Sequence, residues 1–239
     1  MADRATEFSP ELQAFLAEYP RNRPAIARFV AQTAARLEPG ARVLDAGAGE
    51  APYRELFSHC EYVTSDWGNS WHPGAKEADI IAPIDDLPVE DGSFDAVICT
   101  EVLEHVARPR RALRELGRVL AGGGRIHITV PFVWALHEEP YDFQRFTAHG
   151  LEQLLTDTGF TEIEVRPLTG YLATLGQVLQ FYNPPPGGSA LRRLPRRALA
   201  RAVQKFGGVI GRFDRGHGSE LLPLGYCATA VKRADNADG

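Results

Sequence analysis

The stretch from Val43 to Pro52 constrains the fold of this chain more than any other. It reads VLDAGAGEAP, with an apolar run, two glycines one residue apart and a proline. The apolar run predicts a strand that is covered on both faces, as in a parallel sheet. Gly47 and Gly49 allow a sharp turn against which a ligand can press, and Pro52 suits the first turn of a following helix. A strand, a glycine turn and a helix in this order indicate a nucleotide-type site at the carboxyl edge of the sheet.

Two residues of this stretch argue against a dinucleotide. The dinucleotide fingerprint needs a third glycine, and Pro52 stands in its place. Asp45 would put a carboxylate where the pyrophosphate lies, so a cationic or zwitterionic ligand fits better. The motif apolar-Asp-x-Gly-x-Gly is present as Leu44, Asp45, Gly47 and Gly49. In this motif the chain resembles the class I S-adenosylmethionine (SAM) methyltransferases. The resemblance implies SAM as the cofactor, with Asp45, Gly47 and Gly49 at its methionyl end.

The predicted second strand, residues 61–66, ends in an acid. In Rossmann-type sites an acid at this position accepts hydrogen bonds from the ribose hydroxyls, and SAM has the same ribose diol. We therefore assign Asp66 to the ribose, the alternative being a solvated loop aspartate. Trp67 follows directly and either packs on the adenine or belongs to the core.

Residues 83–95 resemble the Leu-Pro loop of SAM methyltransferases of the ubiquinone-biosynthesis type. In that family the loop covers the adenine, and an acid contacts the adenine amino group. Pro83 stands at the place of the usual acid, so the resemblance leaves Asp85 or Asp86 for this contact, with Ile84 beside them.

The segment after the predicted fourth strand, residues 101–106, resembles the same family. The resemblance places Cys99 and Thr100 near the methionyl part of SAM. It gives His105 a structural role in orienting the helix that follows.

The stretch 131–147 is predicted to form the acceptor side of the site. It leaves the carboxyl end of the fifth strand, has no helix or strand period, and is dense in aromatic and ionisable residues, as in a small-molecule pocket. It resembles the His-x-x-Pro-x-Asp-x-x-Arg-aromatic-Thr segment of one methyltransferase subgroup, whose substrates vary. The candidates for contact with the acceptor are Trp134, Glu138, Tyr141, Asp142 and Arg145.

Methyl transfer from a sulfonium is an in-line displacement, and most of the rate can come from holding the acceptor and the methyl in line. A base helps where the acceptor is a hydroxyl or a protonated amine, and His137 is the candidate because its ordinary pKa lies near neutrality. Glu138 and Asp142 are alternatives that would bind an amine, and Arg145 would bind an acidic group or pair with Asp142. A structural role is equally open for each of these residues. The sequence offers no compact set of ligands, so no metal is predicted.

The order of predicted elements gives the fold class α/β, with strands and helices alternating in a Rossmann-like, doubly wound sheet. Strands are predicted from Val43 and over 61–66, 79–82, 96–100, 125–130, 161–165 and 222–231; helices are predicted over 10–18, 24–37, 53–57, 110–120 and 148–158. The glycines at 122–124 are expected to end the fourth of these helices. The resemblance implies a seven-stranded sheet whose last strand runs antiparallel between the fifth and sixth.

We divide the chain into four parts. Residues 1–39 are helices that cap the cofactor site or, alternatively, an amphipathic pair packed on the sheet. Residues 40–169 are the SAM-binding core, residues 170–220 a helical basic insertion, and residues 221–239 the last strand with a disordered tail.

The insertion is long for a connection between two strands. Apolar spacing predicts helices over 171–182 and 191–213, the second weakened in its middle by Gly207 and Gly208. Residues 191–215 hold eight Lys or Arg and one acid, a net charge of +7 against −12 for the remainder. The preferred interpretation is a lid over the acceptor pocket. An element lying on an anionic membrane is the second, and a surface for an acidic partner or nucleic acid is the least favoured.

The composition, with 44% hydrophobic residues among 239, suits one α/β domain with additions. Three separated cysteines, a polar amino-terminal stretch and the lack of a long apolar run predict a cytoplasmic protein without a membrane span. The predicted function is SAM-dependent methyl transfer to an oxygen or nitrogen of a small-molecule acceptor. The rival interpretations are a nicotinamide-dependent oxidoreductase, which Pro52 and Asp45 disfavour, and a non-catalytic SAM-binding scaffold.

Overall fold

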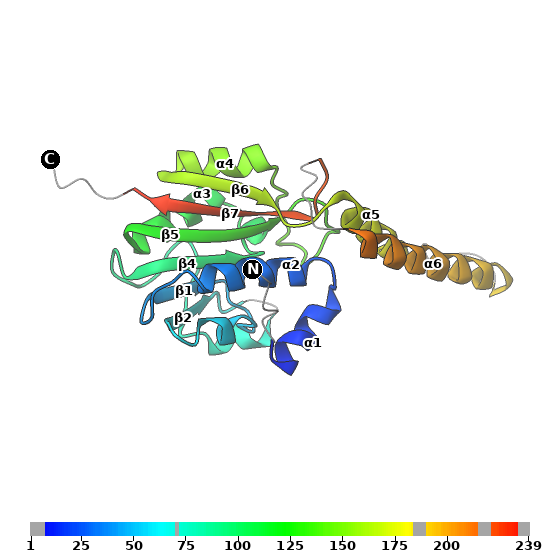
Figure 1. The fold of residues 1–239 in the computed structure, drawn as a ribbon, viewed down its shortest axis with the longest axis horizontal. Coiled ribbons are helices and arrows are strands. Elements are labelled where there is room, and N and C mark those ends of the chain that lie inside the picture. Colours follow the sequence, from blue (N-terminus) through cyan, green and yellow to red (C-terminus); the bar gives the residue numbers. More distant parts are fainter. Residues whose placement is uncertain (1–7, 70–71, 184–189, 215–220, 234–239) are drawn as a thin grey trace, which may run out of the picture.

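A seven-stranded sheet forms the centre of the molecule (Figure 1). The computed structural model describes residues 8–69, 72–183, 190–214 and 221–233. The strands are β1 (Arg42–Ala46), β2 (Glu61–Asp66), β3 (Ile80–Ile81), β4 (Phe94–Thr100), β5 (Leu120–Pro131), β6 (Phe160–Pro167) and β7 (Gly225–Lys232). Their order is β3-β2-β1-β4-β5-β7-β6, and β7 runs antiparallel to both of its neighbours while the other pairs are parallel. The predicted fold class is confirmed, including the antiparallel last strand between β5 and β6.

Helices cover both faces of this sheet. They are α1 (Pro10–Glu18), α2 (Arg23–Ala34), α3 (Pro109–Val119), α4 (Ala148–Asp157), α5 (Tyr171–Gln180) and α6 (Ala190–Ile210), with short 3-10 turns η1 (Arg54–Phe57), η2 (Pro73–Glu77), η3 (Leu103–His105) and η4 (Gly211–Phe213). Local signals explain several helix starts. Proline occupies the first turn of α1, α2 and α3, and the Thr147 hydroxyl accepts a hydrogen bond from the Gly150 amide at the start of α4.

The alternation of side chains along β1 shows how the two apolar layers are divided. Val43 packs with α1 and α2 on one face, and Leu44 packs with α3 and α4 on the other. Both side chains are fully buried. A strand that is apolar at successive positions is therefore explained by burial on both faces, as the sequence predicted.

The strand order reverses at β1, which lies between β2 and β4. In open α/β sheets the carboxyl ends of the strands at such a reversal border the ligand crevice. The glycine turn follows β1, and residues 100–106 follow β4, so both motif segments lie at this point of the sheet.

Three details of the local structure differ from the prediction. After the glycine turn the chain forms only the 3-10 turn η1 instead of a helix over 53–57. Helix α3 ends at Val119 because Leu120 is already extended and begins β5. The glycines at 122–124 therefore lie inside β5 and do not end the helix.

Helices α5 and α6 pack against each other, and α6 projects away from the sheet (Figure 1). Helix α6 continues through Gly207 and Gly208, the residues that the sequence predicted to weaken it. A Cβ atom on Gly207 would lie 2.6 Å from the Gly176 carbonyl oxygen of α5, and a Cβ on Gly176 would lie 2.6 Å from the Gly207 carbonyl oxygen. The missing side chains allow the two backbones to touch. Arg21 fixes the same junction by donating to the Gly208 carbonyl oxygen at 3.0 Å.

Within the described parts of the chain, no helix combines the length and the apolar character that crossing a bilayer requires.

Candidate active site

A cavity of about 770 Å³ opens at the carboxyl ends of β1, β2 and β4. This volume lies within the range of small-molecule sites. The wall combines parts of the chain that are far apart in sequence: α1 and α2, the glycine turn, the end of β2, residues 82–85, residues 100–108 and the loop after β5. Residues of the two amino-terminal helices line the cavity, and the same helices also pack on the sheet.

The glycine turn is held in a left-handed conformation. Gly47 has φ +80° and Gly49 has φ +55°, values that side chains rarely tolerate. The Gly47 amide donates to the Ser65 carbonyl oxygen at 2.8 Å, and a Cβ at Gly47 would lie 2.5 Å from the Val102 side chain. The turn is therefore fixed by β2 on one side and by the segment after β4 on the other.

Asp66 connects the end of β2 to this turn. Its carboxylate accepts a hydrogen bond from the Gly49 amide at 2.8 Å and lines the cavity. Burial raises the pKa of Asp66, while the hydrogen bonds from the Gly49 and Trp67 amides oppose the rise. The other predicted cofactor residues that line the cavity are Gly47, Gly49, Trp67, Ile84, Asp85 and Thr100. Asp85 also lies 3.0 Å from the Arg111 guanidinium Nε.

Two residues assigned to the cofactor lie outside the cavity lining. Asp45 is 1% exposed, and its carboxylate accepts a hydrogen bond from the Tyr62 hydroxyl. Burial raises the pKa of Asp45 to about 7. Cys99 is fully buried in the apolar core, because successive residues of a strand alternate between faces and Thr100 is the one that reaches the cavity. The structure therefore brings Gly47, Gly49 and Thr100 to the predicted methionyl end, but not Asp45 or Cys99.

The loop after β5 forms the opposite wall with Trp134, His137, Glu138 and Tyr141. Tyr141 meets Trp67 edge to face at a centroid distance of 5.1 Å, so this wall touches the cofactor side. Trp134 stands between two helical segments: its ring lies 5.4 Å from that of Tyr19 after α1 and 5.1 Å from that of Phe181 after α5.

Asp142 and Arg145 support this loop from behind and do not line the cavity. The Asp142 side chain is 1% exposed and accepts from Arg145 Nη2 at 2.7 Å and from the His137 amide at 3.0 Å. Burial alone would raise the pKa of Asp142, but these hydrogen bonds lower it to about 2. Of the two roles open for Arg145, the structure shows the pairing with Asp142. Neither residue therefore lies on the cavity wall, where the sequence predicted a contact with the acceptor.

Further ionisable residues, none of them predicted from the sequence to bind the cofactor or the acceptor, gather at one part of the cavity. Glu101, His105 and His72 line it, and Glu104 is completely buried next to it. His72 Nε2 lies 3.5 Å from Glu138 Oε1, and the hydrogen bond from His72 lowers the pKa of Glu138. Burial raises the pKa of Glu104 well above its usual range, and the neighbouring Glu101 adds to the rise. The Glu-x-x-Glu-His run at 101–105 was visible in the sequence and is the signal that could have found this group.

His137 lies beside His105, with 4.7 Å between the ring centroids. Burial lowers the pKa of His137, and the neighbouring His105 lowers it further. Its imidazole is therefore neutral at physiological pH.

Residues 44–128 match the methyltransferase domain family. Over these residues the chain is similar to methyltransferase domains. Its curated relatives include the probable tRNA methyltransferase 9B of Homo sapiens, 31% identical over 114 residues, which are 45% of this chain and 24% of that protein. They also include the ubiquinone biosynthesis O-methyltransferase of Xanthomonas axonopodis pv. citri, 35% identical over 108 residues, which are 40% of this chain and 45% of that protein. The chain thus spans less than half the length of these two relatives.

Solved structures share the fold over most of the chain. A SAM-dependent methyltransferase from Archaeoglobus fulgidus has a TM-score of 0.58 at 16% identity, covering 92% of this chain and 99% of that one. The [4+2]-cyclase SpnF has a TM-score of 0.56 at 21% identity, covering 89% of this chain and 82% of that one. Because one of these is described as a cyclase, the fold alone does not assign the reaction.

Proposed function

We propose that this protein transfers the methyl group of SAM to an oxygen or nitrogen atom of a small-molecule acceptor. The observation that carries the proposal is the cavity in which the glycine turn after β1 faces the aromatic and histidine wall after β5. A cofactor held on one side and an acceptor held on the other would meet inside it.

The proposed cofactor contacts follow the lining of the cavity. The turn at Gly47 and Gly49 would hold the methionyl end, with Thr100 beside it, and Asp66 would accept hydrogen bonds from the ribose hydroxyls. Trp67, Ile84 and Asp85 would surround the adenine. Because the Gly49 amide already binds Asp66, the ribose contact and the methionyl contact would form as one unit.

The proposed reaction is an in-line displacement. The acceptor lone pair forms a bond to the methyl carbon, the S–C bond breaks, and its electron pair returns to sulfur to give S-adenosylhomocysteine. His137 lines the cavity with a neutral imidazole, which supports it as the group that takes the acceptor proton. Trp134 and Tyr141 would hold the acceptor in line, which is where most of the rate enhancement arises.

The names of the relatives point to different acceptors, since they include a probable tRNA methyltransferase, a ubiquinone biosynthesis O-methyltransferase and a thiol S-methyltransferase. The small-molecule proposal rests on the aromatic, partly enclosed wall and not on these names. A second candidate acceptor is lipid-like, delivered at an anionic membrane, and the observation that favours it is on α6.

Three apolar side chains, Leu199, Phe206 and Phe213, recur every seven residues along α6 and η4, and they are 55%, 60% and 68% exposed. Exposed cations flank them at Arg197, Arg201, Lys205 and Arg212. A basic helix with an exposed apolar stripe is typical of elements that lie on anionic membranes. Within its described residues the insertion lines no part of the cavity, which argues against the predicted lid.

The experiment that tests the main proposal is calorimetric titration with SAM, S-adenosylhomocysteine and NAD in parallel. We expect binding of the two adenosyl-sulfur ligands and none of NAD. Asp66→Ala should weaken SAM binding by about 1–3 kcal/mol, the scale of a lost hydrogen bond to a charged group. Asp91→Ala, which removes a carboxylate that is 79% exposed and does not line the cavity, is the matched control. Equal SAM affinity of wild type and Asp66→Ala would remove Asp66 from the site, and no adenosyl binding at all would favour the scaffold interpretation.

A further inference from the structure

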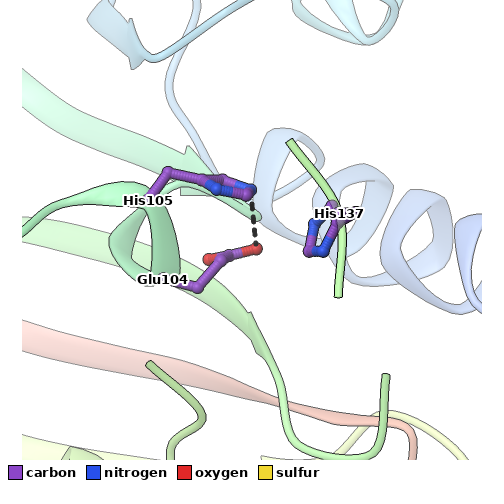
Figure 2. A group of neighbouring side chains, drawn as sticks. All are labelled: Glu104, His105 and His137. Carbon is purple, nitrogen blue, oxygen red and sulfur yellow. Dashed lines mark ion pairs between the residues drawn. The ribbon is translucent and has the colours of Figure 1, made fainter. Parts of the chain in front are cut away.

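Three side chains at the acceptor end of the cavity bring their nitrogen and oxygen atoms together. Among the residues that the structure describes, Glu104, His105 and His137 place one potential metal-ligand atom each within 4.8 Å of the others. His105 Nε2 lies 3.8 Å from Glu104 Oε1. Figure 2 shows the two imidazole rings beside the Glu104 carboxylate, with His105 and Glu104 on the turn after β4 and His137 on the loop after β5.

The hydrogen bonds of the two histidines fix which nitrogen carries the lone pair. His105 Nδ1 lies 3.0 Å from the Tyr141 carbonyl oxygen, which can only accept, so Nδ1 holds the hydrogen and Nε2 holds the lone pair of the neutral ring. His137 Nδ1 lies 3.2 Å from the Ala135 carbonyl oxygen and 3.3 Å from Asp142 Oδ2, with the same consequence. Histidines that bind metals usually donate their other ring N–H to a carbonyl or carboxylate in this way.

Glu104 supplies the second and independent observation. Its side chain is fully buried, and neither carboxylate oxygen has a hydrogen-bond partner within the described structure. Buried polar atoms without partners are rare because their desolvation is not compensated. A further carboxylate oxygen, Glu138 Oε2, lies 4.0 Å from His105 Nε2. The position between these groups therefore suits a cation.

We propose that Glu104, His105 and His137 bind one divalent transition-metal ion at the acceptor end of the cavity. Two histidines and one carboxylate form the donor set of catalytic zinc and of non-haem iron(II) sites. Such a set leaves coordination positions open, and they face the cavity because His105 and His137 line it.

The ion would select acceptors that can coordinate it, and this consequence rests on the proposed methyl transfer. A hydroxyl bound to the ion loses its proton to water more readily, and the resulting oxyanion attacks the methyl carbon while the S–C electron pair returns to sulfur. His137 is then a ligand of the ion, and the ion takes over the activation of the acceptor.

The test is a titration of the tag-free, chelator-treated protein with Co²⁺, followed by visible absorbance, and with Zn²⁺, followed by calorimetry. We expect one equivalent of each ion. His137→Ala and Glu104→Gln should each weaken Co²⁺ binding by about tenfold or more. His149→Ala, which removes an imidazole that is 97% exposed on α4, should leave the titration unchanged. Far-UV circular dichroism verifies that each variant is folded.

Thermal melting gives a readout that does not depend on the absorbance signal. With chelator present, Glu104→Gln should melt no lower than wild type, because it replaces a buried carboxyl without hydrogen-bond partners by an amide of similar size. With Zn²⁺ present, only wild type should gain in melting temperature. The proposal is overturned if wild type binds neither ion stoichiometrically, or if the two site variants titrate like wild type. Calorimetry with SAM on the same samples keeps the questions separate, because loss of SAM binding refutes the methyl-transfer proposal and leaves the metal result standing.

Discussion

Replacing Asp45 by asparagine should remove a dependence of stability on pH that wild type shows. Asp45 is completely buried, and burial raises its pKa from 3.8 to about 7. A carboxyl whose pKa is higher in the folded state stabilises the fold at low pH, and this contribution is lost as pH rises from the unfolded pKa towards the folded one. In the Asp45→Asn variant the side-chain amide oxygen would still accept the hydrogen bond from the Tyr62 hydroxyl, but the amide has no proton to lose over this pH range.

The size of the effect follows from the two pKa values. Between pH 5 and pH 8, a shift from 3.8 to about 7 corresponds to a loss of about 2–3 kcal/mol of unfolding free energy in wild type. The Asp45→Asn variant should lack this loss, so the difference between the two proteins changes with pH by that amount. Taking the difference in unfolding free energy between the two proteins cancels the contributions of the other buried acids, including Glu101 and Glu104, because both proteins contain them.

The assay is urea unfolding of both proteins at pH 5 and pH 8 without SAM, with Asp91→Asn as an exposed control that should follow wild type. A difference that stays constant between the two pH values would mean that the pKa of Asp45 is not raised, because a carboxyl with a pKa at or below 3.8 does not titrate between pH 5 and pH 8. That result would refute the reasoning from burial.

Two further predictions concern the glycine turn and α6. Gly47→Ala should lower both the stability of the protein and its affinity for SAM. The added Cβ would lie 2.5 Å from the Val102 side chain, and alanine would also have to adopt a backbone φ of +80°. Gly123→Ala is the control, because Gly123 has a similar φ of +79° but no described atom lies within 4 Å of the added Cβ. It should cost only about 1–2 kcal/mol of stability. Urea unfolding of both variants then separates the effect of the steric clash from that of backbone strain. The protein should co-sediment with vesicles containing anionic lipid at low salt, and Phe206→Ser, a change in a side chain that is 60% exposed, should reduce the bound fraction without altering SAM affinity. Absence of co-sedimentation, or equal binding by Phe206→Ser, would leave α6 without a membrane role.

The sequence predicted the fold well because the pattern of β1 and the order of the elements are local properties. Val43 and Leu44 are both apolar because the sheet is covered on both faces, and this pattern can be recognised in the sequence alone. The position of β7 came from the family resemblance alone, because no spacing rule places an antiparallel strand between β5 and β6.

The site was predicted less completely, for reasons that depend on single residues. Cys99 could have been excluded by strand alternation once Thr100 was assigned to the cavity. The roles of Asp142 and Arg145 depend on whether the two side chains pair with each other or bind the acceptor. The sequence allowed both, and the structure shows the pair. The cluster of Glu104, His105 and His137 was missed because the turn after β4 and the loop after β5 meet only in three dimensions.

Trp134 gives the arm formed by α5 and α6 a way to communicate with the acceptor. One face of the Trp134 environment is the cavity, and its ring also contacts Phe181 at the end of α5. An acceptor that reorients this indole would change its contact with Phe181, and so would a surface that displaces α5 when it binds α6. If both binding events alter this contact, linkage requires each to change the binding free energy of the other by the same amount.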